Sequence, residues 1–242
     1  MTQPMDRREF LAAGLGWFPF FRRRYVALAG ARFRVLRRGR SPRRYLVIHG
    51  SEETARQVLE RHMRVSPGVA YVVTSHGRNV RVGAGQIDPN RMFSRPGAAR
   101  SLRRLNPRWT APEIERALAQ LDRGREKFLR ALLPPRGGRL LALHNNSEGY
   151  SVRDEVPISD RVSLKNSGDP HAFFLCTDPR DFDRLAASPY NVVLQQKAPP
   201  DDDGSLSRLA AARGVRYVNL EVRLGNAARQ EEMLRFAESV LP

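Results

Sequence analysis

Short apolar runs of four to six residues recur along this chain, and this recurrence limits its fold more than any other feature. Runs of this length are typical of strands that are buried on both faces of a sheet. Helical patterns separate most of them, which predicts an α/β fold with three layers, α/β/α, around a central mixed, largely parallel sheet. The apolar runs are 45–48, 69–74, 140–143, 173–176, 191–194 and 217–220, and the helical segments are 112–133, 179–187, 205–213 and 227–240.

A hairpin is predicted to open the folded part of the chain, with strands at 25–29 and 32–36 joined at Gly30. A chain of 242 residues is long enough for one large α/β core. We therefore expect a single domain over residues 25–242.

Residues 1–24 differ from the rest and predict an N-terminal leader. Asp6-Arg7-Arg8-Glu9-Phe10-Leu11, followed by an apolar stretch to Phe21, resembles a twin-arginine export signal. Three arginines then follow, before any small-residue cleavage site. Two hypotheses stay open, an exported, periplasmic protein and a cytoplasmic protein that keeps its leader. We expect no transmembrane segment, because no stretch approaches the roughly 18 apolar residues that span a bilayer.

The charge balance bears on possible partners. Lys and Arg number 42 against 25 Asp and Glu, which gives a formal net charge of +17, and only Lys127, Lys165 and Lys197 are lysines. The arginines run the full length of the chain and form no single stripe. This distribution favours a general preference for arginine over a nucleic-acid footprint. We expect no nucleic-acid partner, and instead a small molecule or peptide as substrate.

Any metal site in this chain must use histidines and carboxylates. Cys176 is the only cysteine, which excludes an intrachain disulfide and a cysteine-based zinc site. Five histidines are present, at positions 49, 62, 76, 144 and 171. His62 falls within a predicted helix and His171 begins an apolar run, so both are expected to be structural. His76 follows an apolar strand and is a candidate either for the site or for its loop.

Polar side chains directly follow three of the apolar runs. They are His49, His144 and Glu221, and Glu52 comes three residues after the first of them. Ligands of open α/β sheets bind outside the carboxyl ends of the strands, so these side chains are expected to converge at one sheet edge. Two imidazoles and two carboxylates there suit a catalytic zinc site, which has three protein ligands and one open position.

The turn after His49 is expected to bring a carboxylate back towards this histidine. Gly50 permits a sharp turn, and a helix predicted from Ser51, as its cap, to about Met63 places Glu52 in the first turn. Glu53 is a rival for the same position, because an error of one residue in the turn exchanges the two glutamates.

Four segments carry a combined signal. They are His49-Gly50-Ser51-Glu52, Asp88-Pro89-Asn90-Arg91-Met92-Phe93, Leu143-His144-Asn145 and Asn219-Leu220-Glu221-Val222. The first resembles an H-G-N-E zinc motif, the second a D-x-N-R-x-F segment and the third an L-H-N segment. The fourth resembles a segment with a catalytic glutamate at the end of a strand, which Glu221 matches. In this order they resemble the succinylglutamate desuccinylase and aspartoacylase family, a branch of the zinc carboxypeptidase superfamily. The resemblance spans positions 45 to 222.

The resemblance implies a hydrolase with one zinc ion per chain, which cleaves an amide bond next to a free carboxylate, as an N-acyl amino acid deacylase or a carboxypeptidase-like enzyme. His49, Glu52 and His144 would be the zinc ligands. Glu221 would be the general base and then the general acid. These roles suit the chemistry, because zinc lowers the pKa of water towards about 7 and a nearby carboxylate can accept the proton.

The resemblance also implies how the substrate is bound. Asn90 and Arg91 would bind the substrate carboxylate, since a guanidinium matches a carboxylate bidentately, and Asn145 is a further substrate-binding candidate. No second substrate arginine is assigned. Arg78 and Arg81 both precede Asn90 at distances that suit a cation polarising the scissile carbonyl.

A second hypothesis, from another functional class, is a non-catalytic protein that keeps the same fold and binds a carboxylate ligand or a protein partner. Bound zinc without activity on any amide would favour it. Glu148 and Tyr150, just beyond His144, are candidates to line the pocket, with loop packing as the alternative.

Overall fold

The structure is a computed structural model that describes residues 24–197 and 201–242. Its strands are β1 (Arg24–Leu28), β2 (Ala31–Arg38), β3 (Arg44–Val47), β4 (Gly68–Val73), β5 (Val80–Val82), β6 (Gly85–Ile87), β7 (Leu140–Asn146), β8 (Arg161–Ser163), β9 (Phe173–Cys176), β10 (Asn191–Leu194) and β11 (Tyr217–Arg223). Its helices are α1 (Glu53–His62), α2 (Arg95–Leu105), α3 (Ala111–Leu132), α4 (Val152–Glu155), α5 (Pro179–Leu185), α6 (Leu206–Ala212) and α7 (Ala227–Val240), with 3-10 turns η1 (Pro89–Arg91) and η2 (Val156–Ile158).

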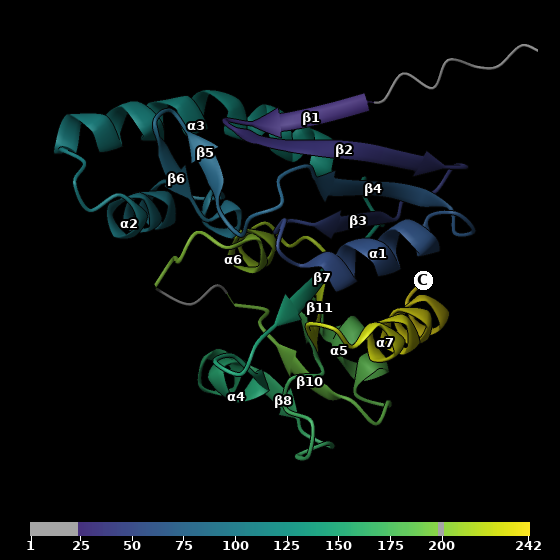
Figure 1. Ribbon diagram of the computed structural model, residues 1–242. Coiled ribbons are helices and arrows are strands. Elements are labelled where there is room, and N and C mark those ends of the chain that lie inside the picture. Colours follow the sequence, from purple (N-terminus) through teal and green to yellow (C-terminus); the bar gives the residue numbers. More distant parts are fainter. Residues whose placement is uncertain (1–23, 198–200) are drawn as a thin grey trace, which may run out of the picture.

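Nine of these strands form one mixed sheet, in the order β1-β2-β4-β3-β7-β11-β9-β10-β8 (Figure 1). Its centre, β4-β3-β7-β11, is parallel. The next two strands, β9 and β10, are parallel to each other but antiparallel to β11, and β1, β2 and β8 also pair in antiparallel fashion. The carboxyl ends of β3, β7 and β11 therefore meet at one edge.

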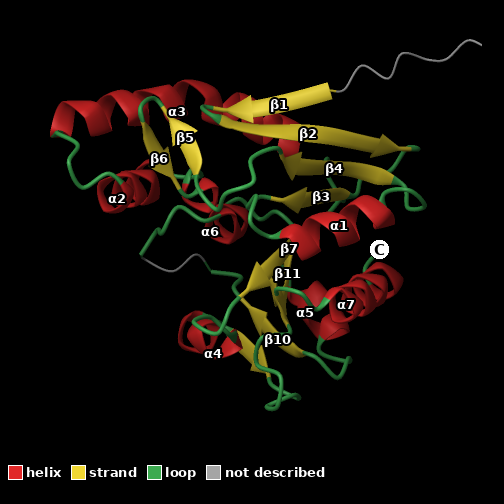
Figure 2. Cartoon of the chain, in the orientation of Figure 1, coloured by secondary structure: helices red, strands yellow, loops and turns green. Residues whose placement is uncertain are grey.

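Helices cover both faces of the sheet (Figure 2). Apolar side chains of α1, α5 and α7 pack on one face. Those of α2, α3, α4 and α6 pack on the other, together with the small hairpin β5–β6. The result is the expected three-layer α/β/α arrangement around a mixed sheet with a parallel centre.

Alternation along the two central strands decides which face carries the site. Successive side chains of a strand point to opposite faces. Ala142 of β7 belongs to the core on the α3 side, so His144, two residues on, points to the same side. Tyr217 of β11 also belongs to that core, which places Glu221 there as well. The two polar side chains therefore share one face.

The predicted apolar strands and helices are confirmed to within a few residues, including the opening hairpin. Two of the predicted strands end too early, because β7 continues to Asn146 and β11 to Arg223. His144 and Glu221 thus lie inside strands, and not directly after them. The helix α2 and the hairpin β5–β6 were not predicted. The arginines of α2 are exposed, and its buried positions are mostly small residues, namely Gly97, Ala98, Ala99 and Ser101 beside Leu102. The sequence analysis overlooked this helix because its buried face carries few large apolar side chains.

The predicted leader falls on residues that lie outside the described part, except Arg24, which begins β1. Within the described residues, no helix combines the length and the apolar character needed to cross a membrane.

Candidate metal centre and active site

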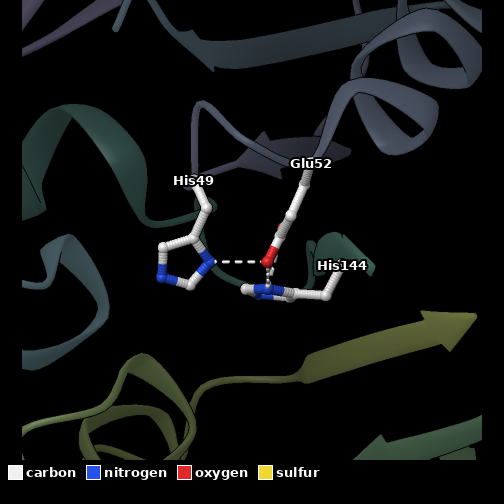
Figure 3. Close-up of side chains that lie close together, drawn as sticks. All are labelled: His49, Glu52 and His144. Atoms are coloured by element: carbon white, nitrogen blue, oxygen red, sulfur yellow. Dashed lines mark hydrogen bonds and ion pairs between the residues drawn. The ribbon is translucent and has the colours of Figure 1, made fainter. Parts of the chain in front are cut away.

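Three buried side chains meet at the carboxyl ends of β3 and β7 (Figure 3). His49 follows β3, Glu52 directly precedes α1, and His144 lies within β7. Their candidate ligand atoms all lie within 4.8 Å of one another, and none of the three residues is more than 4% exposed. The structure thus brings together the three residues that the sequence proposes as metal ligands.

The turn between β3 and α1 holds the first two of these side chains. Gly50 donates its amide hydrogen to Gly77 O at 3.0 Å, and a Cβ at position 50 would lie only 2.1 Å from Ser75 O. Only glycine allows such a close approach of two backbones. The turn then returns the chain so that Glu52 contacts His49, as the spacing predicts.

The carboxylate at the site belongs to Glu52 and not to its rival Glu53. The side chain of Glu53 is 55% exposed and contacts Gln57 and Arg56 on the outer face of α1. The predicted cap at Ser51 is wrong, because the N-cap residue is Glu52. Its side chain makes no capping hydrogen bond, since it is turned towards the two histidines instead.

The charges of these groups are tightly linked. His49 donates from Nδ1 to Glu52 Oε1 at 2.7 Å and from Nε2 to Asp88 Oδ1 at 2.9 Å. Burial by itself lowers the pKa of His49, but the two carboxylates outweigh burial and raise this pKa to about 9. Burial raises the pKa of Glu52, yet His144 and His49 outweigh it and bring this pKa down to about 2. In the metal-free chain the site is therefore an imidazolium–carboxylate network.

Asp88 contacts the candidate metal centre, and the sequence analysis gave it no role of its own. Its carboxylate binds the ring nitrogen of His49 that faces away from Glu52. Metal-binding histidines commonly donate their second nitrogen to such a carboxylate, which fixes the orientation of the ring. The signal was present, because Asp88 begins the segment that includes Asn90 and Arg91.

The three side chains fit a metal ion. Glu52 Oε2 is buried and has no hydrogen-bond partner within residues 24–197 and 201–242, although His144 Nδ1 lies 3.2 Å away. An unsatisfied buried carboxylate oxygen costs free energy unless a cation or donor compensates it. Two imidazoles and one carboxylate are also ligands that zinc accepts. This group can therefore hold a metal ion.

Glu221 lies beside this group on the neighbouring strand. It is the register partner of His144 across the β7–β11 pair and is 5% exposed. Asn219 Nδ2 donates to Glu221 Oε1 at 3.1 Å, and Asn146 Nδ2 donates to Oε2 at 3.2 Å. Burial raises the pKa of Glu221, although His144 opposes this rise. A carboxylate with a raised pKa, held by two donors, is suited to accept a proton.

The two asparagines that hold Glu221 were missed by sequence analysis. Asn146 lies two residues after His144, and Asn219 lies two residues before Glu221. The alternation of side chains along a strand was a sufficient signal, because it places each asparagine on the same face as its neighbour.

Asn145 is the sequence-proposed substrate residue with the most contacts inside the protein. Its Oδ1 accepts from Ala55 N at 2.8 Å, and its Nδ2 donates to Gln230 Oε1 at 3.0 Å. Gln230, from α7, also donates to the backbone oxygen of His144 at 2.9 Å. These bonds fix β7 against α1 and α7, and the proposed contact of Asn145 with substrate stays a prediction. Gln230 had no signal in the sequence.

A cavity of about 550 Å³ lies next to the candidate metal ligands. Cavities of this size suit small-molecule ligands. Every site residue proposed from the sequence lines it: His49, Glu52, Asn90, Arg91, His144, Asn145 and Glu221. Of the two rival arginines, Arg78 lines the cavity and lies 3.6 Å from both Glu52 and Asp88, whereas Arg81 is not among the lining residues.

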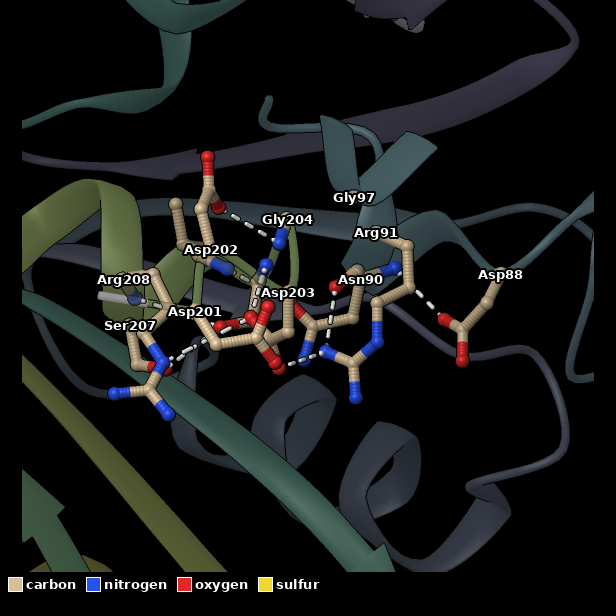
Figure 4. A network of polar contacts seen from close by, with 12 residues as sticks. Asp88, Asn90, Arg91, Gly97, Asp201, Asp202, Asp203, Gly204, Ser207 and Arg208 are labelled. Atoms are coloured by element: carbon tan, nitrogen blue, oxygen red, sulfur yellow. Dashed lines mark hydrogen bonds and ion pairs between the residues drawn. The ribbon is translucent and has the colours of Figure 1, made fainter. Parts of the chain in front are cut away.

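Two arginines, Arg91 and Arg208, line one wall of the cavity; Figure 4 shows them with the polar groups around them. Arg91 pairs with Asp203 at 3.0 Å, and Arg208 Nε lies 3.9 Å from the same carboxylate. Asn90 Oδ1 accepts from Leu206 N at 3.0 Å, which joins η1 to α6. Arg208 Nη1 is buried without a partner in the described part of the chain. Two guanidiniums thus share one carboxylate. Arg208 was missed, because one arginine among so many gives no signal.

Neither a protein-family profile nor a curated protein matches this sequence. Among solved structures, similar chains include the ectoine utilization protein EutE (DoeB) from Ruegeria pomeroyi. Its apo structure is 18% identical with a TM-score of 0.45, and its product-bound structure is 15% identical with a TM-score of 0.43. A "putative metallopeptidase" from Shewanella denitrificans OS217 is 11% identical, also with a TM-score of 0.45.

The matched lengths differ between these structures. The EutE comparisons cover 85% of this chain but 59% of EutE, so this chain spans less than two thirds of that protein. The Shewanella comparison covers 89% of this chain and 81% of the other. At these scores, the chemistry of the site has to be argued from its own residues.

Proposed function

We propose that this chain is a zinc-dependent hydrolase that cleaves an amide bond next to a free carboxylate, as an N-acyl amino acid deacylase or a carboxypeptidase-like enzyme. One observation carries the proposal. Glu52 is buried between two imidazoles with one oxygen unsatisfied, and Glu221 lies on the adjacent strand in the same cavity. The motif resemblance in the sequence supports the same chemistry.

His49, Glu52 and His144 would hold the zinc ion, and Asp88 would fix the ring of His49. Bound zinc supplies Lewis acidity, which polarises a carbonyl and acidifies water. Arg78 lies near Glu52 and Asp88, with its side chain 57% exposed. We propose that Arg78, rather than Arg81, polarises the scissile carbonyl from the open side of the site.

Glu221 is the proposed general base. It accepts a proton from the attacking water and returns this proton to the leaving nitrogen, so that the amine departs neutral. The donors Asn146 and Asn219 fix both carboxylate oxygens during the first transfer. The raised pKa of Glu221, caused first by burial, favours its protonated form between the two transfers.

Arg91 and Arg208 form the proposed binding site for the substrate carboxylate. Arg91 and Arg208 together carry two positive charges against the single charge of Asp203, so a substrate carboxylate would complete the balance. Asn90 holds η1 against α6 and thereby fixes the relative position of the two arginines. A guanidinium presents paired donors to a carboxylate, which an ammonium group does not.

The test compares an N-acetyl amino acid with its carboxamide. The zinc-loaded protein should cleave the carboxylate form with a kcat/KM at least tenfold above that of the carboxamide. Arg91→Lys keeps the charge but loses the bidentate geometry, so it should lower kcat/KM for the carboxylate and leave the carboxamide nearly unchanged. Equal losses on both compounds would show that Arg91 does not bind the substrate carboxylate. Cleavage of neither compound, nor of a short peptide, would contradict the proposed activity itself.

A further inference from the structure

A second charged group lines the cavity away from the arginines. Glu155, at the end of α4, is partly buried and belongs to the cavity wall. The hydroxyl of Tyr150 donates to Oε1 at 2.6 Å, and Gln195 Nε2 donates to Oε2 at 2.5 Å. Two neutral donors thus fix the orientation of this carboxylate.

Glu155 has no ion-pair partner among residues 24–197 and 201–242, in a chain with 42 basic residues. Most other partly buried carboxylates here do have one, as Asp122 does with Arg125 and Glu238 with Arg139. Each carboxylate oxygen accepts more than one hydrogen bond, so the pair of neutral donors leaves acceptor sites free. A cationic ligand would compensate the charge.

Glu155 lines the same cavity as the proposed general base, Glu221. Tyr217, Asn219 and Glu221 alternate along the same face of β11 and all line the cavity. Tyr150, whose hydroxyl donates to Glu155, lines the same cavity as Glu221. Burial raises the pKa of Tyr150, and the carboxylates Glu221 and Glu155 both add to the rise. Glu155 therefore belongs to the same cavity as the proposed base, on the wall that α4 contributes.

The cavity thus has two charged walls. The arginines come from η1 and α6, and Glu155 comes from α4, which is well separated from α6 in Figure 1. The candidate metal ligands and Glu221, near the carboxyl ends of β3, β7 and β11, line the same cavity. A ligand with one negative and one positive group would match both walls at once.

We propose that Glu155 binds an ammonium group of the substrate, so that the preferred substrate carries a cationic amine as well as a carboxylate. This inference rests on the proposed function, because it assigns a second substrate-binding group to the same cavity. A short peptide with a free amino terminus has this pair of charges. An ammonium group donates three hydrogen bonds, and Glu155, the hydroxyl oxygen of Tyr150 and the amide oxygen of Gln195 offer three acceptors.

Binding of unreactive ligands tests this inference without depending on hydrolysis. The probes are ω-aminocarboxylates of four to eight carbons and the matching carboxylates without the amine, titrated calorimetrically into the zinc-loaded protein. At one or more chain lengths, the amine should tighten binding roughly 10- to 100-fold, the range of a charge-assisted hydrogen bond. Glu155→Gln should bring the two ligand types to within about twofold and leave the carboxylates unchanged.

Glu148→Gln is the matched control. Glu148 lies in the loop before α4, but its side chain is 90% exposed, pairs with Arg223 and is not part of the cavity wall. This variant should keep the preference for the amine. Equal binding of both ligand types to the wild type at every length would overturn the inference, and so would a preference that survives Glu155→Gln. The wild-type comparison holds even if the variant folds poorly. Amine-dependent binding without hydrolysis of any amide would contradict the proposed activity alone.

Discussion

At the scale of single residues, the carboxylates around His49 favour its protonated form, whereas metal binding requires its neutral form. In the metal-free chain, Glu52 and Asp88 hold it as an imidazolium and outweigh burial, so its pKa lies at about 9. A metal ligand must be a neutral imidazole. Below pH 9, metal binding therefore has to displace a proton from His49, and the same carboxylates then face the metal ion and the neutral ring.

We expect zinc affinity to rise at least tenfold per pH unit from roughly pH 6.5 to pH 9, and to rise less steeply above that range. The direction follows from the raised pKa, because the competing proton of His49 is bound below pH 9 and lost above it. Titrations across this range, in buffers of different ionisation enthalpy, should show at least one proton released per zinc ion near pH 7.5, one from His49 and a further share from the water that zinc acidifies. Asp88→Asn should lower the pH at which the slope decreases. An affinity that does not depend on pH would contradict this description of the site.

At the scale of elements, the strands of the central sheet were predictable and parts of its surroundings were not. Strands buried on both faces, such as β3 and β9, leave uninterrupted apolar runs. The polar ends of β7 and β11 belong to the same strands, but His144 and Glu221 interrupt the apolar pattern that defines a strand in the sequence. The helix α2 has one arginine face and one buried face, but small residues form most of the buried face, so the sequence carries few of the large apolar side chains that mark a helix.

The tight turn between β3 and α1 makes a prediction at this scale. Gly50→Ala would place a Cβ 2.1 Å from Ser75 O, so the turn has to open and separate His49 from Glu52. We expect a loss of about 2 kcal/mol or more in the free energy of unfolding and weaker zinc binding. The control is Gly149→Ala, where a Cβ meets nothing within 4 Å, and it should stay within about 0.5 kcal/mol. Urea unfolding measures both, and equal effects of the two variants would contradict the close-packed turn.

At the scale of the whole molecule, the site joins elements that lie far apart in the sequence. The candidate ligands and Glu221 were predictable, because each follows a buried apolar run of the sequence, or a turn after one, and these runs meet at one sheet edge. The residues that support them were harder to find. Asp88, the cap of η1, contacts His49, while Arg208 and Glu155 reach the cavity from α6 and α4, and no local pattern specifies the packing of these elements. The net charge of +17 gave no direct signal either, since only a few of the charged side chains line the cavity.

The activity of Glu221→Gln tests the central claim most directly. We predict that this variant keeps about one zinc ion per chain and its melting temperature, but loses roughly 10² to 10⁴ in kcat, the usual value of general acid–base assistance. Glu53→Gln is the control, because Glu53 is 55% exposed outside the site and should keep both zinc and kcat. A loss of less than tenfold in a folded, zinc-loaded Glu221→Gln would contradict the proposed mechanism, as would a wild-type protein that binds zinc and turns over no amide.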